Sequence, residues 1–366
     1  MPSTGHRKCL YCSSRGLSME KDVHFYKAEC VTRRRWTPSI MPDSTKPEEA
    51  SSQTPAKIID SHCHIASLVH IPKSFVAGAV ANMKAVLTAQ GMKVNSSQLE
   101  EMYYQKMQDP LCDELVAEMQ EAGISKSILL IADFTYAKKD CSSTIEESFQ
   151  KHREVLARHP GKFEVFGGVD PRWGKDGIAL FERSLSQYGF RGFKIYPPCG
   201  FSPSDPALFP FYELCAQYRV PAVVHIGPTS PTLSFRHASP FLLDEAALNF
   251  PTVNFILAHG SVNFTEECAM MCRFRPNIFL DISAFQTLPQ SDAEALKRTV
   301  SQGVNHKVLF ATDWPVFRLQ GNQRRFVDIV LKQPGPFSGL NRRESSWIFH
   351  KNIEQLLSDR ALLMLE

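Results

Sequence analysis

Two histidines and an aspartate recur at intervals of two residues in the stretch IIDSHCHI, residues 58–65. In a β-strand, side chains two residues apart share a face, so a strand would place Asp60, His62 and His64 together. Two neutral imidazoles on one face can converge on a metal ion, and zinc accepts histidine nitrogen readily. In a single H-x-H motif, however, a buried histidine pair without a metal is the commoner outcome, so further residues are needed.

Three other apolar runs also end in ionisable residues. His225 ends VPAVVHIG, His259 ends VNFILAHG, and Asp313 ends KVLFATDWP. Burying this many ionisable groups is unfavourable unless they are paired or coordinated. Because a shared metal ion would account for all of them, the sequence predicts a metal site.

A repeated alternation of short apolar runs and longer helix-like segments must position these residues. The eight runs are KIIDSHCHI, KSILLIAD, KFEVFGGVD, RGFKIYPP, VPAVVHIG, VNFILAHG, NIFLDIS and KVLFATDWP. Eight strand–helix units predict an α/β fold of the (β/α)₈ TIM-barrel type, which typically needs about 250 residues. A doubly wound sheet is the alternative, but no Gly-rich phosphate loop follows the first run.

The connection between the first two runs, residues 66–125, is much longer than one loop and one helix. We expect helices at about 72–90 and 97–122. Since this insertion leaves the C-terminal end of the first strand, it would cover the barrel mouth as a lid or shape the substrate pocket. A peripheral decoration or a homodimer contact is the alternative.

The chain divides into an N-terminal extension with a Pro/Ser/Thr/Glu-rich linker, residues 1–56, and the barrel, residues 57–366. We expect the extension to be loosely structured, because its composition cannot bury much apolar area. It contains the spacing C-x₂-C-x₁₁-H-x₅-C, formed by Cys9, Cys12, His24 and Cys30. These four residues could hold a structural zinc ion, and a disordered leader is the alternative.

The composition is that of an ordinary globular protein, with 43% hydrophobic and 22% charged residues and a net charge of +3. This balance predicts neither nucleic-acid binding nor membrane insertion. The polar start lacks a secretory signal. Most of the ten cysteines lie singly in apolar or helical segments, which indicates reduced thiols. We therefore expect a cytoplasmic protein.

Five of the motifs together resemble the amidohydrolase superfamily, in particular its amidohydrolase-related branch of metal-dependent hydrolases and decarboxylases. The motifs are IIDSHCHI, GFKIYPP, VPAVVHIG, ILAHG and LFATDWP, in this order. The resemblance covers about residues 57–360. It implies a TIM barrel with a divalent metal at its mouth, for which zinc is the expected ion.

The resemblance also implies roles for individual residues. His62, His64, His225 and Asp313 would be the metal ligands, and Asp313 would also transfer protons. His259 would lie beside the metal water and the substrate, where it could polarise the reacting carbonyl. Asp60 is expected to fix the orientation of a ligand ring, since it shares their strand face.

Lys194 in GFKIYPP has three interpretations. In binuclear relatives the corresponding lysine is carboxylated and bridges two metals. With a single metal, which the surrounding motif favours, its ammonium could bind a substrate carboxylate. A lysine that extends from the barrel rim into water is the third interpretation.

Five other residues at strand ends are substrate candidates by position only: Asp133, Asp170, Arg172, Tyr196 and Trp314. A carboxylate-bearing small molecule would favour Arg172 or Lys194 as its partner. Cys63 falls on the opposite face from the histidines, so we expect it to pack against the helices rather than act as a nucleophile.

The leading functional prediction is hydrolysis of a small amide, ester or lactone by a metal-activated water. The alternative is non-oxidative decarboxylation of a carboxylated small molecule with the same ligands. A third possibility is a binding module without catalysis. The presence of a suitable residue at every predicted ligand position argues against it.

Overall fold

The computed structural model describes residues 55–287, 293–332 and 335–358. Cys9, Cys12, His24 and Cys30 lie outside these ranges, so the zinc site of the extension stays a prediction. No helix in the described ranges is long and apolar enough to cross a bilayer.

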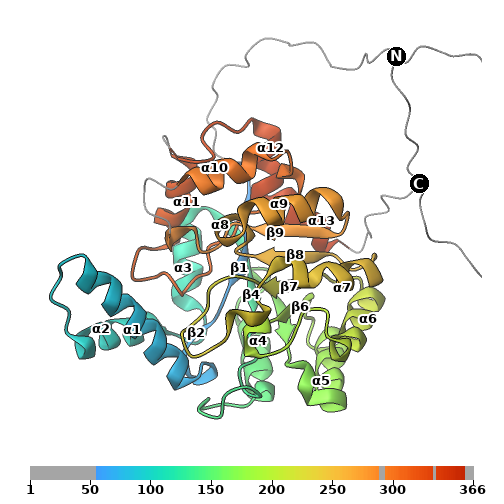
Figure 1. The fold of residues 1–366 in the computed structure, drawn as a ribbon, viewed down its shortest axis with the longest axis horizontal. Helices are drawn as coiled ribbons and strands as arrows, with labels where there is room; N and C mark the ends of the chain where they lie inside the picture. The colour runs from blue at the N-terminus through green and yellow to red at the C-terminus, as the bar shows by residue number, and fades with distance from the viewer. Residues whose placement is uncertain (1–54, 288–292, 333–334, 359–366) are drawn as a thin grey trace, which may run out of the picture. The chain divides into compact units, whose positions relative to one another are not determined.

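Eight parallel strands form the central sheet of the described residues, and their order in the sheet follows the chain. They are β1 (Ile58–Cys63), β4 (Ile124–Leu130), β5 (Phe163–Gly168), β6 (Gly192–Ile195), β7 (Ala222–His225), β8 (Phe255–Ala258), β9 (Ile278–Asp281) and β10 (Val308–Leu309). The first strand meets the residues after the last one, since Ser61 N–H donates to the Phe310 carbonyl at 3.0 Å and Asp313 N–H to the His62 carbonyl at 2.8 Å. The sheet closes on itself, which confirms the predicted barrel (Figure 1).

Apolar side chains fill the barrel interior below the strand ends. The strands contribute Ile59, Ile128, Leu130, Phe166, Val223, Ile256, Ala258, Phe279 and Leu309. The helix α13 (Asn352–Leu357) adds Ile353 and Leu356, and its Asn352 amide donates to the Val308 carbonyl at 2.8 Å, where β10 begins. Because the N-terminal end is closed in this way, polar residues inside the barrel face its C-terminal mouth.

Helices surround the barrel, as Figure 1 shows. They include α4 (Ile145–Arg158), α5 (Gly174–Gln187), α6 (Phe209–Tyr218), α7 (Asp244–Asn249), α8 (Gly260–Asn263), α9 (Thr265–Phe274), α10 (Ala293–Ser301), α11 (Gln323–Leu331) and α12 (Arg342–Ser346). Their starts follow local chemistry: at α4, Thr144 and Glu147 form a capping box that satisfies two free N–H groups.

The insertion after β1 contains two helices, α1 (Lys73–Ala89) and α2 (Ser96–Lys106), and the short strands β2 (Ala66–Ser67) and β3 (Gln108–Asp109). The prediction of a single helix over 97–122 is therefore wrong. Helix α2 ends at Lys106, Cys112 takes a left-handed φ of 60°, and a separate helix, α3 (Asp113–Ala122), follows. Asp109 stabilises this new start by accepting the Leu115 N–H at 2.9 Å. Thus α3 is the helix of the first barrel unit.

The insertion packs on loops that follow the C-terminal ends of the strands. Val76 and Tyr103 belong to its small apolar core, against which Leu319 of the loop after β10 packs. The Phe75 ring lies 5.2 Å from Phe134, which follows β4, and its carbonyl accepts the Ser230 hydroxyl at 2.9 Å after β7. The insertion therefore contacts three mouth loops.

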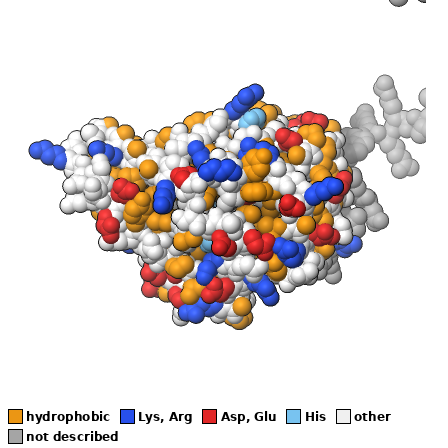
Figure 2. Space-filling view, turned by 90° about the horizontal axis from the view of Figure 1, so that it is seen from below, with side chains coloured by type: hydrophobic (Ala, Val, Ile, Leu, Met, Phe, Trp, Pro, Cys, Tyr) orange, Lys and Arg blue, Asp and Glu red, His pale blue; other side chains and the backbone are white. Residues whose placement is uncertain are grey.

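The surface carries both signs of charge on the face seen in Figure 2, where Lys/Arg and Asp/Glu side chains are interspersed. Charge on this face does not gather into a single patch, in keeping with the small net charge of +3.

Candidate metal centre

Four histidines and an aspartate gather at the barrel mouth. His62 lies on β1 with His64 just after it, His225 ends β7, His259 follows β8, and Asp313 follows β10. His62, His259 and Asp313 are buried, and each has a ligand atom within 4.8 Å of the other two. These three residues form the centre of the candidate site.

The other two predicted ligands adjoin this group through one partner each. His64 Nε2 lies 3.2 Å from Asp313 Oδ1, and His225 Nδ1 lies 3.2 Å from His259 Nε2. His259 thus lies inside the group, although the sequence assigned it a role beside the metal. The structure brings all five predicted residues together.

Acceptors on the far side of each ring determine which ring nitrogen carries the proton. His62 Nδ1 lies 2.9 Å from Asp281 Oδ2, and His64 Nδ1 lies 2.7 Å from the Leu130 carbonyl. His225 Nε2 faces the Pro228 carbonyl at 3.0 Å. Since carbonyl and carboxylate oxygens only accept, a neutral ring must donate from these nitrogens and keep a lone pair on the other one.

His259 follows the same rule through Ser283. The Ser283 hydroxyl donates to Asp281 Oδ1 at 2.5 Å, so its oxygen accepts from His259 Nδ1 at 2.8 Å. The remaining lone pairs then face other acceptors: His259 Nε2 faces His225 Nδ1, and His62 Nε2 faces Asp313 Oδ1 at 3.4 Å. A cation among these atoms removes the repulsion between them, so the donor set fits a divalent metal.

The pKa values favour the protonation states that a metal requires. Burial, reinforced by nearby positive charge, lowers the pKa of His62 and His225 well below the usual value, and burial also lowers the pKa of His259. Burial alone would raise the pKa of Asp313, but the neighbouring histidines outweigh it and lower the pKa to about 2. At neutral pH the site therefore offers neutral imidazoles and an ionised carboxylate.

Asp281 and Ser283, at the end of β9, were missed by the sequence analysis. Asp281 accepts from His62 and Ser283, and also from the His259 backbone N–H at 2.8 Å. The run NIFLDIS ends in polar residues as the ligand-bearing runs do, which could have identified them.

Asp60 does not fix a ring, and that expectation was wrong. Its carboxylate accepts from the backbone N–H groups of His62 and Thr312, and from Cys63 Sγ and Gln323 Nε2. The pairing of β1 with β4 is irregular between Asp60 and Cys63, so strict alternation fails there. Asp60 instead joins the backbones that carry His62 and Asp313. Cys63 packs, as expected, in the larger apolar core outside the barrel interior, which we call the outer core.

His259 and Asp313 have unusual backbones. Their φ angles are 63° and 57°, in the left-handed region that non-glycine residues rarely occupy. Each costs about 1–3 kcal/mol, which other interactions must offset. Such residues cluster at functional sites, and here both carry atoms of the central group.

Lys194 on β6 is almost wholly buried, at 1% exposure, and its Nζ has no hydrogen-bond partner among the residues that the structure describes. Extension from the rim into water is therefore ruled out. Burial lowers its pKa to about 8, although the charges of Asp281 and Asp313 oppose the shift. Lys194 pairs in the sheet with Val223, whose side chain lies in the barrel interior two residues before His225, so the lysine side chain faces the same interior. An unpaired buried cation calls for an anionic partner.

The remaining substrate candidates differ in what their side chains contact. Arg172 donates from Nε and Nη2 to the Asp170 carboxylate and from Nη2 to the Cys199 carbonyl, so its role as a substrate contact stays a prediction. Asp133 accepts from Thr135, Asp170 N–H and Trp173, so Asp133 and Asp170 hold loops together.

Tyr196 and Trp314 point in different directions. The Tyr196 ring lies 4.2 Å from His225, and its hydroxyl contacts Thr229 at 2.8 Å, so it lines the site. Trp314 is fully buried in the outer core and its indole N–H donates to Glu118 at 3.2 Å. Trp314 as a substrate contact was therefore wrong.

Comparisons with known proteins bear on the whole barrel. The amidohydrolase family model matches residues 59–358. Protein fluG of Emericella nidulans is 24% identical over 103 residues, which cover 28% of this chain and 12% of that protein. A 2-keto-4-carboxy-3-hexenedioate hydratase of a Sphingobium species is 32% identical over 100 residues, 23% of this chain and 29% of that protein. Each match spans less than a third of the relative.

Solved structures share the fold. An uncharacterized TIM-barrel protein from Bordetella bronchiseptica has a TM-score of 0.59 and 19% identity, over 82% of this chain and 98% of that one. A 2,6-dihydroxybenzoate decarboxylase has a TM-score of 0.59 and 16% identity, over 82% and 99%. A manganese-bound 5-carboxyvanillate decarboxylase from Novosphingobium aromaticivorans has 0.56 and 12%, over 84% and 98%. Since the family model spans residues of all eight strands and of the candidate site, this chain belongs to the amidohydrolase family.

Proposed function

We propose that this chain is a metal-dependent lyase that decarboxylates a small carboxylate-bearing molecule without an oxidant. Family membership supports an enzyme, and several of the solved structures with its fold are decarboxylases. Hydrolysis is the leading prediction from sequence, and these likenesses favour the alternative, decarboxylation. A cytoplasmic location and a homodimer stay predictions from sequence.

The unpaired ammonium of Lys194 is the observation on which the proposal rests. A substrate carboxylate beside Nζ would supply the anionic partner that the described residues do not. Tyr196, with its ring against His225, would provide an apolar surface for the rest of the molecule. The same position could instead hold a carboxylated lysine between two metals, which elemental analysis would distinguish.

One divalent ion would be held by His62, His259 and Asp313, with His64 and His225 adjoining. When bound, it would stabilise the negative charge that develops on the substrate oxygens. In decarboxylation the bond to the carboxyl carbon breaks, its electron pair stays on the substrate, and a proton must return to that carbon. We assign the transfer of this proton to Asp313, because His259 would have one ring nitrogen on the metal and the other bonded to Ser283. Some of the neighbours hold manganese, and zinc accepts the same donors, so the ion itself is open.

Product analysis tests the proposal. Protein loaded with Mn²⁺ or Zn²⁺ is offered hydroxybenzoates and unsaturated dicarboxylic acids, and CO₂ is measured beside metal stoichiometry. We expect one ion per chain and CO₂ release from at least one acid. Hydrolysis of simple esters or lactones, without CO₂ release from any acid, would overturn the proposal that the chain is a lyase.

A pair of lysine variants sharpens this test. Lys194→Met should lower the rate of CO₂ release at least 100-fold, because the substrate carboxylate loses its partner. Metal binding and stability should be kept, because the substitution removes an unpaired buried charge. Lys307 is the control, since its Nζ donates to three carbonyls, those of Cys272, Arg275 and Pro276. Lys307→Met should lower stability and keep the activity of the folded protein. Full activity in Lys194→Met would contradict the assigned role.

Hydrolysis is the second candidate function. Asp313 is ionised at neutral pH, with a pKa of about 2, and can orient a water molecule at the same centre. In that case Lys194→Met would leave the hydrolysis of uncharged esters unchanged.

A further inference from the structure

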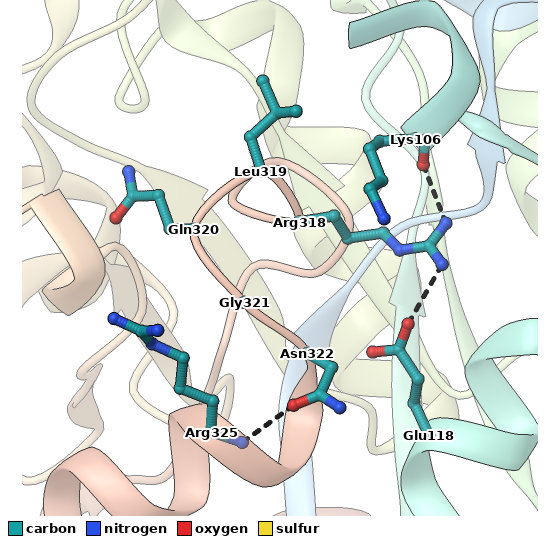
Figure 3. A pocket seen from close by; sticks show the side chains of 8 residues that line it. All are labelled: Lys106, Glu118, Arg318, Leu319, Gln320, Gly321, Asn322 and Arg325. Carbon is teal, nitrogen blue, oxygen red and sulfur yellow. Dashed lines mark hydrogen bonds and ion pairs between the residues drawn. The ribbon is translucent and has the colours of Figure 1, made fainter. Parts of the chain in front are cut away.

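The insertion after β1 is attached to the barrel at both of its ends. At the end of α2, Arg318 of the loop after β10 donates to the Lys106 carbonyl at 2.8 Å and to Glu118 of α3 at 3.0 Å (Figure 3). The start of α1 instead meets the loops that follow β4 and β7. We call residues 226–234 the β7 loop, which directly follows the predicted metal ligand His225.

The first turn of α1 takes its cap from the loop after β4. Its N-cap residue, Pro72, has no side-chain acceptor for the free N–H groups of the turn. Asp140 of the loop after β4 supplies one, since its Oδ2 accepts the Ser74 N–H at 2.6 Å. Lys138 of the same loop donates to the Thr232 carbonyl of the β7 loop at 2.7 Å. The start of α1 is therefore stabilised by the barrel rather than by its own sequence.

The helix α1 also approaches the β7 loop directly. Ser230, which is 5% exposed, donates its hydroxyl to the Phe75 carbonyl at 2.9 Å. About one turn further along α1, a Cβ on Gly78 would lie 2.6 Å from the Ser230 oxygen. Glycine therefore lets the helix lie against the loop, and a methyl group at this position would push the two apart.

Two routes of contact lead from this attachment to His225. The first follows the β7 loop, because Ser230 lies two residues after Pro228, whose carbonyl faces His225 Nε2 at 3.0 Å. The second is a chain of aromatic rings whose successive centroids lie 5.2, 5.0 and 4.2 Å apart, namely those of Phe75, Phe134, Tyr196 and His225. Both routes begin on α1 and end at the same imidazole.

We propose that docking of α1 on the β7 loop and binding of the metal stabilise each other, with Phe75 and Ser230 as positioning residues that act through His225. While α1 is docked, the Pro228 carbonyl stays on His225 Nε2 and leaves Nδ1 for the metal centre. Undocking removes this support and weakens metal binding, and a bound metal in turn keeps α1 on the mouth loops. The inference rests on the metal centre of the proposed function and is independent of the reaction.

Reciprocal measurements test this coupling, because the factor by which docking raises metal affinity equals the factor by which the metal favours docking. We expect the Kd for Mn²⁺, measured by competition with a chelator, to rise at least fivefold in Phe75→Ala, Gly78→Ala and Ser230→Ala. Alanine is a better helix former than glycine, so a weaker affinity in Gly78→Ala cannot come from a weaker α1. Mn²⁺ is the probe because it prefers oxygen and imidazole ligands to the thiolates of the N-terminal extension.

Hydrogen exchange followed by mass spectrometry gives the other half of the test. Saturating Mn²⁺ should slow exchange in α1 of the wild type at least fivefold, and by less in the three variants. The helix α5, in the outer layer, is the internal control, because a metal that merely stabilises the whole barrel would slow exchange in α1 and α5 equally.

Ser125→Ala is the control variant for Ser230→Ala. Its hydroxyl also donates to a carbonyl at 2.9 Å, that of Ile58, but at the opposite end of the barrel, where β1 and β4 begin. It should keep the wild-type Kd. An unchanged Kd in all three α1 and β7-loop variants, or equal slowing in α1 and α5, overturns the coupling and leaves the metal centre standing. Absence of Mn²⁺ binding by the wild type overturns both.

Discussion

The nitrogen of each histidine that points away from the site determines what the other nitrogen can do. Asp281 has the largest part in this, since it accepts from His62, Ser283 and the His259 backbone N–H. Its carboxylate keeps the His62 lone pair directed at Asp313 and, through Ser283, that of His259 directed into the site. Outer partners of this kind tune metal affinity.

Replacing this carboxylate by an amide should weaken metal binding. We expect Asp281→Asn to lower metal affinity about 10–100-fold, measured by competition with a chelator. The control is Asp205→Asn, at a half-buried aspartate that starts a short helix by accepting the Ala207 N–H. Equal affinities in Asp281→Asn and wild type would contradict the assigned role.

His152 gives a pH dependence that is independent of any metal. It is buried in α4, with Nδ1 against the Ser148 carbonyl and, within the described ranges, no partner for Nε2. Burial lowers its pKa to about 3 from 6.5. Between these values the unfolded chain binds a proton that the folded chain does not, so stability is lost as the pH falls through this window.

The free energy of unfolding should therefore fall less steeply below pH 6.5 in His152→Phe than in wild type. The difference should reach about 1.4 kcal/mol per pH unit. Urea unfolding with a chelator present, at pH 7, 6 and 5, measures it. Parallel curves for the two proteins would exclude this contribution.

Among the elements, α2, α3 and the loop after β10 are joined by one side chain. Arg318, with 7% of its side chain exposed, bonds to the end of α2 and to Glu114 and Glu118 of α3, and it lies on Trp314. The Trp314 carbonyl accepts the His64 N–H at 2.7 Å. Arg318 is thus a positioning residue for the insertion and for the turn that carries Asp313.

Arg318→Met should cost about 3 kcal/mol, because it leaves Glu118 partly buried without its cation. It should also lower metal affinity and increase hydrogen exchange in α2. Adding Glu118→Gln should recover part of the stability. Arg324→Met, which removes an exposed ion pair with Asp328, should cost below about 1 kcal/mol. Unchanged exchange in α2 would show that this link is weak.

Elements governed by local sequence could be predicted. Each of the eight apolar runs overlaps one strand, and the ionisable residues that end four of them gather at the candidate site. The second insertion helix was wrong because Asp109 and the left-handed Cys112 restart the chain at α3. The role predicted for Asp60 was wrong because an irregularity in β1 breaks the alternation of side chains on which that prediction depended.

Across the whole molecule, contacts between distant residues were beyond sequence reasoning. Asp281 supports His62 across 219 positions, and Gln323 reaches Asp60 across 263. Neither spacing leaves a local pattern. The inward turn of His259 depends on a left-handed backbone angle that its side-chain type does not specify.

A ligand held by several strands should stabilise the whole barrel. At a metal concentration 100 times the Kd, the gain is about 2.7 kcal/mol, which corresponds to roughly 5 °C in Tm. Thermal melts with and without metal measure this shift. It should be absent in His62→Ala and kept in His237→Ala, whose residue lies outside the site. A shift of equal size in both variants would place the metal elsewhere.

The closure of the barrel also sets an order of events during synthesis. Ser61 and Phe310, whose contact joins its two ends, are 249 residues apart. At about 5–20 residues per second, the ribosome makes the H-x-H pair on the order of ten seconds or more before Asp313. Until then the nascent chain presents two imidazoles without their carboxylate. Selective loading of a metal must therefore follow translation of the last strand.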